Sequence, residues 1–397
     1  MLDQAARYFV EDTHIMACMT VACGTADTAD HAEAGATRLD GSGAINASTL
    51  FDLASLTKLF TGLTVMRLWE EGRLSLDAPV TDYVPQLVNL SVVTVDQVLG
   101  FEVALTTPKR IDTQPDRDAG LKQLAAIVSQ PQGTGRYYSD MHAMVLGLVI
   151  EGICQMPLMN CIQQEILLPL HMSDTFAKVP ADRLSDCVCY DLEHRIEGGR
   201  YLVRKGIAPG TPHDPKARLL GANGRYLFGH AGLFSTREDM IRLCQGLLKG
   251  SLLCRSTLQQ MARNRLGRQL PDGRYTQYLG SQCYVKHPLQ YYSEIPVYMS
   301  DEAIGLSGFT GNHVAIDPQT GIFSLMLGNR VLNRLTTFIP EPGKSLTDYG
   351  LDPDGSGKFY LPDGTWVYSS VDYVHQKDEH LHKAIAEVLG VPVWHKG

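Results

Sequence analysis

A serine and a lysine stand three residues apart in the segment FDLASLTK, where they are Ser55 and Lys58. On a helix this spacing puts both side chains on one face, so the ammonium group can reach the hydroxyl. A serine hydroxyl is a weak nucleophile until a neighbouring base takes its proton, and a lysine whose pKa is lowered by burial can be that base. The pair is therefore a candidate for nucleophilic catalysis at Ser55. Such a short pattern occurs about once by chance in a chain this long, and the alternative interpretation is an N-cap-like serine with a solvated lysine.

A helix over residues 51–71 would carry this pair. Its apolar residues recur at helical spacing, and Gly72 follows as an expected C-terminal cap. The positive end of that helix would stabilise an oxyanion at Ser55. Further upstream, the apolar run 15–23 is typical of a buried strand, and residues 2–11 have the pattern of a short amphipathic helix.

The remaining sequence changes character once. From 81 to 284 it is mostly helical, with expected helices over residues 94–100, 119–130, 140–155, 157–168, 237–249 and 255–263. After 285, apolar runs such as 314–316 and 322–327 indicate strands, and residues 378–389 a final helix. This order predicts an α/β fold, α+β in some schemes, with an antiparallel sheet flanked by N- and C-terminal helices. We expect a sheet domain from residues 1–80 and 285–397 and a mainly helical insert domain over 81–284.

The sequence around the Ser55 and Lys58 pair resembles the class C β-lactamase and penicillin-binding-protein family of serine hydrolases, in its esterase and D-Ala peptidase branch. Further segments follow in the family's order: EEGRLSLDAPVTDYVPQL, RYYSDMHAMVLGLVIE, LPLHMSDT, HDPKARLLG, GHAGLFST, GLSGFTGNHVAIDP and LGNRV. They lie within residues 48–331. The resemblance implies the β-lactamase/transpeptidase-like fold.

By this resemblance Ser55 is the acylated nucleophile, Lys58 its proton acceptor or relay, and Tyr138 of the YSD segment a second general base. A tyrosinate is a strong base at neutral pH only if cations lower its pKa, which Lys58 would do as a neighbour. Tyr137 is the alternative, one position away. Asp140 stands where the family commonly has Asn, and it would either contact substrate or cap the following helix.

The resemblance also implies an oxyanion hole made by the backbone N–H groups of Ser55 and Phe309. Ser307 and Gly308 are small residues that would let a substrate lie along this strand as an added β-strand. Leu306 stands at a substrate-binding position where the family has Lys or His, a cation that holds the substrate carboxylate. Its loss removes a charge-assisted contact of roughly 1.5–3 kcal/mol. We therefore expect neutral esters or amides as substrates.

Other positions that could do chemistry have simpler interpretations. The family pattern and the glycine neighbours of His230 favour a structural histidine, and His213 is interpreted in the same way. Segment 98–105 reads VLGFEVAL where the branch has LLTHTSGL, which alters the pocket beside the site. Cys187 and Cys189 are the only close cysteine pair, and neither CxxC nor HExxH spacing occurs. We expect no metal and no cofactor.

Composition excludes several classes of protein. Lys and Arg number 35 against 43 Asp and Glu, giving a net charge of −8, so neither nucleic acid nor anionic lipid is an expected partner. The odd number of scattered cysteines, nine, argues against a disulfide framework. No apolar run reaches the roughly 18 residues that span a bilayer, and the N-terminus lacks a signal pattern. We expect no membrane span and a cytoplasmic location.

Together these patterns predict a serine hydrolase that forms an acyl-enzyme at Ser55 and acts on a small ester, amide or peptide. Esterase is preferred to D-Ala peptidase and then to β-lactamase. Two alternatives stay open: an acyltransferase of the same fold, and a non-catalytic relative that binds a ligand in the same cleft. No oligomeric state is predicted.

Overall fold

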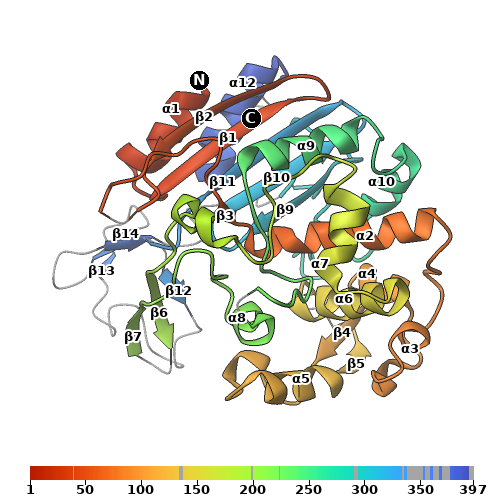
Figure 1. Ribbon diagram of the computed structural model, residues 1–397. Coiled ribbons are helices and arrows are strands. Elements are labelled where there is room, and N and C mark those ends of the chain that lie inside the picture. The colour runs from red at the N-terminus through yellow and green to blue at the C-terminus, as the bar shows by residue number, and fades with distance from the viewer. Residues whose placement is uncertain are drawn as a thin grey trace.

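The computed structural model describes residues 1–38, 40–133, 137–197, 200–222, 224–289, 294–332, 335–337, 352–353, 358–360, 366–368 and 376–392 (Figure 1). Its centre is a five-stranded antiparallel sheet in the order β2-β1-β11-β10-β9. The strands are β1 (Cys18–Thr25), β2 (Ala29–Gly35), β9 (Ile304–Gly308), β10 (Asn312–Asp317) and β11 (Ile322–Asn329). Because β1 pairs with β11 along its whole length, segments from the two ends of the chain are neighbours.

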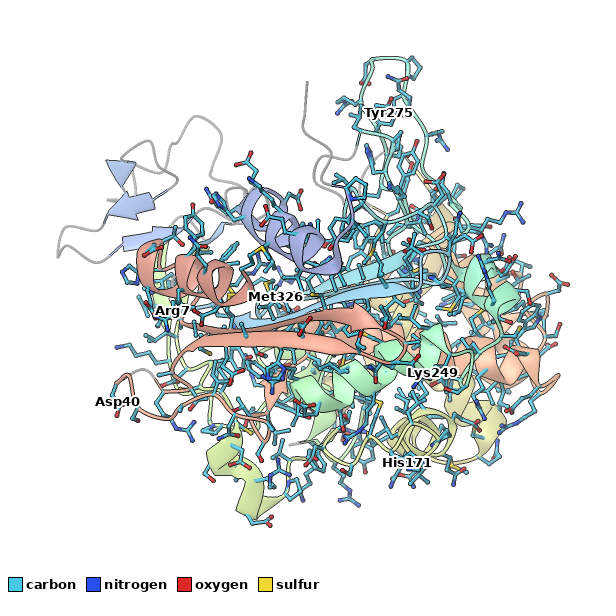
Figure 2. All side chains as sticks on the ribbon, turned by 90° about the horizontal axis from the view of Figure 1, so that it is seen from above. Arg7, Asp40, His171, Lys249, Tyr275 and Met326 are labelled. Carbon is cyan, nitrogen blue, oxygen red and sulfur yellow. The ribbon has the colours of Figure 1, made fainter. Side chains whose placement is uncertain are left out.

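Helices cover both faces of this sheet (Figure 2). On one face lie α1 (Leu2–Arg7) and α12 (His382–Leu389), and on the other lies α9 (Arg237–Leu248). Every residue of β10 and β11 is buried as a result. The predicted class, an antiparallel sheet with helices from both chain ends, is confirmed.

Helix α2 (Thr57–Glu70) is buried on nearly all sides and packs against α6 (Asp140–Cys154) and α7 (Leu158–Ile162). The predicted helix over 51–71 is wrong at its start. Phe51–Asp52 form strand β3, which pairs with β8 (Phe234–Ser235), and Ala54–Leu56 form a 3₁₀ turn. Apolar periodicity does not separate a strand from a helix over so few residues, and the long-range pairing with β8 decides.

The segments between β3 and β9 are mixed. The helices there also include α3 (Val80–Tyr83), α4 (Val95–Leu99), α5 (Arg117–Ala125), α8 (Pro215–Gly221) and α10 (Arg255–Met261). Strand β4 (Val103–Thr106) pairs with β5 (Val128–Pro131), so the predicted helix over 119–130 is too long. Two further small sheets include strands that follow β11. One is formed by β12 (Leu335–Thr337), β6 (Glu193–Glu197) and β7 (Arg200–Arg204), and the other by β13 (Asp352–Pro353), β14 (Lys358–Tyr360) and β15 (Trp366–Tyr368).

Among the residues described above, no single helix has both the length and the apolar character needed to cross a membrane. One pair of helical segments, Asp140–Cys154 and Leu158–Leu167, is together long and apolar enough to do so, but the two segments are bent by 76° relative to each other.

Candidate active site

An unusual backbone angle sets the turn that carries Ser55. Ala54 has a φ of 47°, in the left-handed region that costs a residue with a side chain on the order of 1–3 kcal/mol. Its amide N–H donates to the carboxylate of Asp52 at 2.9 Å, which holds this conformation. The kink ends β3 and begins the 3₁₀ turn, so Ser55 lies at the N-terminal end of α2, where the helix dipole favours negative charge.

Lys58 lies one turn further along, and its side chain is fully buried. Its Nζ donates to Ser55 Oγ at 2.9 Å and to the backbone oxygen of His230 at 3.0 Å, and it pairs with Asp140 Oδ1 at 2.8 Å. Three acceptors match the three protons of an ammonium group. Burial alone would lower the pKa of Lys58, but Asp140 and Tyr138 outweigh burial and raise it. Lys58 is therefore a charged donor to Ser55 rather than the neutral base that burial alone would make.

Tyr138, rather than Tyr137, faces this ammonium. Lys58 Nζ lies 5.0 Å from the centroid of the Tyr138 ring. The ring is stacked between Phe101 and Tyr284, with centroids 5.7 and 5.5 Å away. Tyr137 is only 2% exposed and packs with Phe101 and Leu279 in a small apolar cluster, against which the Tyr138 ring also packs. Of the two neighbouring tyrosines, Tyr138 is thus the one whose ring lies against the Lys58 ammonium.

Gln277 holds the segment that carries these tyrosines. Its Oε1 accepts the backbone N–H groups of both Tyr137 and Tyr138, at 2.8 and 3.0 Å. Phe101, from the segment where the sequence departs from the family pattern, forms the other wall of the stack and has a φ of 58°. The altered segment therefore contributes an aromatic contact to Tyr138.

Asp140 is the first residue of α6, but it is not the helix cap. Ser139 takes that role, because its hydroxyl accepts the N–H of Met141 at 3.2 Å. The carboxylate of Asp140 instead lies between two ammonium groups, Lys58 and Lys216. Burial would raise the pKa of Asp140, but the two lysines hold it well below its usual range.

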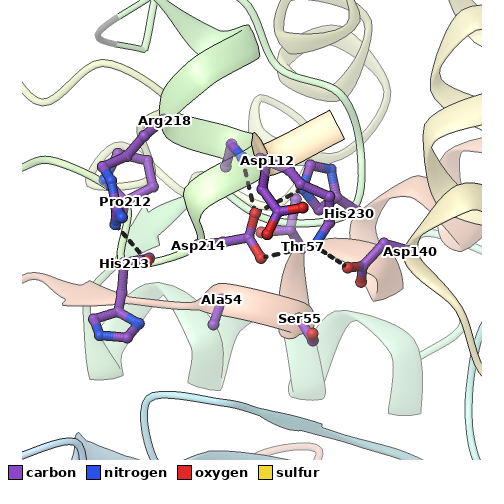
Figure 3. A network of polar contacts seen from close by, with 12 residues as sticks. Ala54, Ser55, Thr57, Asp112, Asp140, Pro212, His213, Asp214, Arg218 and His230 are labelled. Atoms are coloured by element: carbon purple, nitrogen blue, oxygen red, sulfur yellow. Dashed lines mark hydrogen bonds and ion pairs between the residues drawn. The ribbon is translucent and has the colours of Figure 1, made fainter. Parts of the chain in front are cut away.

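A closed ring of polar contacts surrounds this carboxylate, with Asp140, Asp214 and His230 visible in Figure 3 beside Ser55. Asp140 Oδ2 pairs with Lys216 Nζ at 2.9 Å, and Lys216 Nζ lies 3.6 Å from Asp214 Oδ2. Asp214 Oδ1 contacts His230 Nε2 at 3.0 Å, and the backbone oxygen of His230 accepts from Lys58. We call Lys58, Asp140, Lys216, Asp214 and His230 the charge ring. Sequence reasoning did not single out Lys216 or Asp214, although both stand in the quoted HDPKARLLG segment.

Asp52 joins the Ser55 turn to the expected oxyanion strand. Its backbone oxygen accepts from Thr310 Oγ1 at 2.8 Å and from Asn312 Nδ2 at 2.7 Å. Its carboxylate accepts the N–H of His213 at 2.6 Å, and the His213 ring stacks on Phe309 with centroids 5.4 Å apart. Asp52 is fully buried, and this burial raises its pKa to about 6. His213 thus has a structural position beside Phe309.

Phe309 directly follows β9, and its backbone oxygen accepts from Arg330 Nε at 3.0 Å. Gly308 allows β9 to approach the turn that carries Ser55, because a Cβ there would lie 2.6 Å from the backbone oxygen of Leu53. The small residue at this position is therefore needed for packing between strand and turn. Leu306 was expected at a substrate-binding position, but it is fully buried in the main core, so its side chain does not line an exposed cleft.

The outer edge of β9 is partly occupied. The N–H and C=O of Gly305 bond to the backbone of Tyr284 at 3.1 and 2.8 Å. Strand alternation directs the backbone groups of Ser307 to the same side, two residues closer to Phe309. The hydroxyl of Ser307 donates to Glu294, whose carboxylate also pairs with Lys377 Nζ at 3.1 Å. The pairing with Tyr284 thus occupies the Gly305 end of this edge.

Next to Tyr138 lies a cavity of about 560 Å³. Its lining includes Tyr275, Tyr278, Tyr284 and His287. Tyr284 is shared between the cavity wall and the stack on Tyr138. Within the described ranges, no group of three or more His, Cys, Asp or Glu side chains is arranged to hold a metal ion.

Comparison with known proteins gives one family and several relatives. A family model described as beta-lactamase matches residues 19–336. A protein of Salmonella typhi named as a D-alanyl-D-alanine carboxypeptidase is 26% identical over 312 residues, which cover 71% of this chain and 70% of that protein. A protein of the same name from Salmonella dublin matches with the same identity and coverage.

Solved structures share the fold at low sequence identity. EstCE1, a hydrolase with promiscuous acyltransferase activity, has a TM-score of 0.67 at 17% identity and covers 97% of both chains. A penicillin-binding protein homologue from Caulobacter crescentus has a TM-score of 0.66 at 21% identity, covering 85% of this chain and 91% of its own. A class C beta-lactamase in complex with cefoxitin has a TM-score of 0.60 at 17% identity, covering 83% and 92%.

Proposed function

Because this chain belongs to the beta-lactamase family of serine hydrolases, we propose that it cleaves small, uncharged carboxylic esters or amides through an acyl-enzyme at Ser55. The observation that carries this proposal is the contact of 2.9 Å between the buried Lys58 ammonium and Ser55 Oγ. A serine placed against a charged donor at the start of a helix is in the environment that stabilises an alkoxide.

In the mechanism we propose, the phenolate of Tyr138 takes the proton of Ser55 as Oγ attacks the substrate carbonyl carbon. The ammonium of Lys58 stabilises both the phenolate and the developing alkoxide. The N–H groups of Ser55 and Phe309 bind the oxyanion of the tetrahedral intermediate. When the intermediate collapses, the bond to the leaving group breaks and Tyr138 returns the proton to it. This leaves an acyl group on Ser55.

Deacylation repeats the cycle with water as the nucleophile. Tyr138 takes a proton from water as the oxygen attacks the acyl carbon, and then protonates Ser55 Oγ as the acid product leaves. If an alcohol replaces water, the product is a new ester, which is acyl transfer. Because EstCE1, a fold relative, is a hydrolase with promiscuous acyltransferase activity, acyl transfer is a reaction to test here alongside hydrolysis.

Two features favour an uncharged substrate with an apolar group. The ammonium groups of Lys58 and Lys216 are both engaged with Asp140, so neither presents an uncompensated charge to a substrate carboxylate. Three tyrosine rings line the cavity beside Tyr138, together with polar residues such as Arg274 and Glu294, and the rings suit an apolar acyl or alcohol group. A D-Ala peptidase activity, as in the names of the Salmonella relatives, is the reaction that we rank next.

The proposal is tested with p-nitrophenyl butyrate, nitrocefin, a D-Ala-D-Ala peptide and a fluorophosphonate probe. We expect ester turnover and labelling of Ser55, and loss of both in Ser55→Ala, with nitrocefin and the peptide slower than the ester. Ser91→Ala, at an exposed serine away from the site, is the control that keeps full activity. If the wild-type protein is neither labelled nor active, a non-catalytic, ligand-binding relative replaces the hydrolase.

A further inference from the structure

The charge ring holds more charge than the chemistry at Ser55 requires. Asp140 lies between two ammonium groups, with Oδ1 at 2.8 Å from Lys58 Nζ and Oδ2 at 2.9 Å from Lys216 Nζ. The side chain of Lys216 is 19% exposed, and that of Lys58 is not exposed at all. Lys216 comes from α8 and reaches Asp214 at the N-terminus of the same helix, whose Oδ1 accepts the N–H of Ala217 at 2.8 Å.

The ring is balanced in charge. Two ammonium groups, Lys58 and Lys216, face two carboxylates, Asp140 and Asp214. A buried ion is stable only when it is paired, so removing one member leaves a net charge close to the fully buried Lys58. The resemblance to the family predicts a neutral Asn at position 140. The negative charge that Asp140 adds beside Lys58 is matched here by the positive charge of Lys216.

We propose, on the basis of the proposed chemistry at Ser55, that Lys216 is a positioning residue whose ammonium balances Asp140 and so tunes the proton affinity of the Ser55, Lys58 and Tyr138 centre. Without Lys216, the charge of Asp140 would act on Lys58 alone. With Lys216 in place, Asp140 orients Lys58 toward Ser55 while its field is divided between two cations.

Titratable groups inside and outside the ring act on these charges. Within the ring His230 faces Asp140, and from outside it Asp112 faces Lys216. His142, on α6, interacts electrostatically with both Asp140 and Lys58. Its burial lowers its pKa to about 4, so it stays neutral above that pH. Burial would lower the pKa of Lys216, but Asp214 and Asp140 raise it, so Lys216 remains charged through the working range.

The sign of the effect does not depend on which group takes the proton of Ser55. Removing a cation makes a neighbouring tyrosine harder to deprotonate, and it also makes a neighbouring ammonium harder to deprotonate. Loss of Lys216 should therefore move the onset of Ser55 reactivity to higher pH. Loss of the negative charge of Asp140 should move it to lower pH.

The experiment measures the rate of fluorophosphonate labelling of Ser55 against pH for wild type, Lys216→Met, Lys216→Arg, Asp140→Asn and the double variant Asp140→Asn with Lys216→Met. We expect the pH at which the labelling rate is half its maximum, the midpoint, to rise by about one unit in Lys216→Met and to fall by about as much in Asp140→Asn. The double variant should return close to the wild-type midpoint, and Lys216→Arg should stay there. Midpoints that move in the same direction, or that do not move, overturn the proposal.

A second measurement separates this proposal from the proposed function. Urea unfolding of the same variants gives a double-mutant cycle for Asp140 and Lys216 that needs no catalysis. The matched control is the exposed pair of Lys249 and Asp27, 3.2 Å apart, changed to Met and Asn. A coupling free energy between Asp140 and Lys216 larger than that of the control pair supports the proposal that Lys216 balances Asp140, and an equal coupling contradicts it. If the wild-type protein is not labelled, the hydrolase proposal fails, but this cycle still tests whether Lys216 balances the charge of Asp140.

Discussion

Asn312 donates its side-chain amide to the backbone oxygen of Asp52 at 2.7 Å, and this bond fastens the strand after Phe309 to the turn before Ser55. The same amide contacts Thr310 Oγ1 at 2.9 Å, and Asn312 Oδ1 accepts the N–H of Gly328 at 3.0 Å. All of these groups are buried. The two N–H groups of the proposed oxyanion hole come from different segments, so their spacing depends on this connection.

Replacing Asn312 should therefore affect catalysis more than binding. In Asn312→Ala the N–H of Gly328 loses its buried partner, which costs about 1–3 kcal/mol of unfolding free energy, whereas the oxygen of Asp52 keeps its bond from Thr310 Oγ1. We expect kcat for a p-nitrophenyl ester to fall roughly 10-fold or more with little change in KM, because the oxyanion is bound only in the transition state. Steady-state kinetics on the folded variant test this, with the exposed Asn160→Ala as control. A rise in KM alone would argue against a role in the oxyanion hole.

Gly308 should tolerate no side chain. The Cβ of alanine would lie 2.6 Å from the backbone oxygen of Leu53, and neither backbone can move without shifting the Ser55 turn. Overpacking of this kind costs about 1–3 kcal/mol, so we expect a lower melting temperature together with at least a 10-fold loss of kcat/KM in Gly308→Ala. Gly133→Ala is the matched control, because nothing lies within 4 Å of a Cβ at that position. Unchanged activity in Gly308→Ala would show that the strand and the turn need not approach so closely.

The parts of this site that sequence alone predicts are those set by local geometry. The spacing of Ser55 and Lys58 is enough to bring Nζ to 2.9 Å from Oγ, because one helical turn fixes it. The direction of the pKa shift of Lys58 is not set by local geometry. It depends on Asp140, which lies on another helix, and it is opposite to the direction that burial alone gives.

The fold shows the same division. Apolar periodicity predicts α2 and α6, but it misplaces the start of α2, because the φ of Ala54 and the pairing of β3 with β8 are set by tertiary contacts. The helix cap at Ser139 rather than Asp140 follows from the same cause, since Lys58 and Lys216 draw the Asp140 carboxylate away from the helix end. A motif position alone places Leu306 at the substrate, and its burial becomes visible only when the strand is packed on the core.

Asp52 should make stability fall as pH rises. Burial raises its folded-state pKa to about 6, above the ordinary value of 3.8 in the unfolded chain. The folded protein therefore binds the proton more tightly, so the stabilisation from this group is complete below the unfolded value and is lost as pH rises through about 6. The shift corresponds to roughly 3 kcal/mol of unfolding free energy. Asp52→Asn should remove this slope between pH 4 and 7 in urea unfolding. A slope equal to that of the wild type would assign it to another group.

The aromatic cavity gives a prediction about substrate choice. Tyr278 lines the cavity and contacts His287 at 4.7 Å between ring centroids, whereas Tyr284 forms the wall that stacks on Tyr138. Removing Tyr278 should therefore weaken binding of the apolar group of the substrate without disturbing Tyr138, the proposed general base.

In Tyr278→Ala we expect KM for a p-nitrophenyl phenylacetate to rise about 10-fold, since a buried aromatic contact contributes about 0.5–1.5 kcal/mol beyond the area it buries. The acetate ester is too small to fill the cavity, so its KM and kcat should stay the same. Tyr278→Phe keeps the ring and should behave as wild type with both esters. An equal loss for both substrates would mean that Tyr278 supports the fold of the site rather than its selectivity, and the cavity would then have no part in substrate recognition.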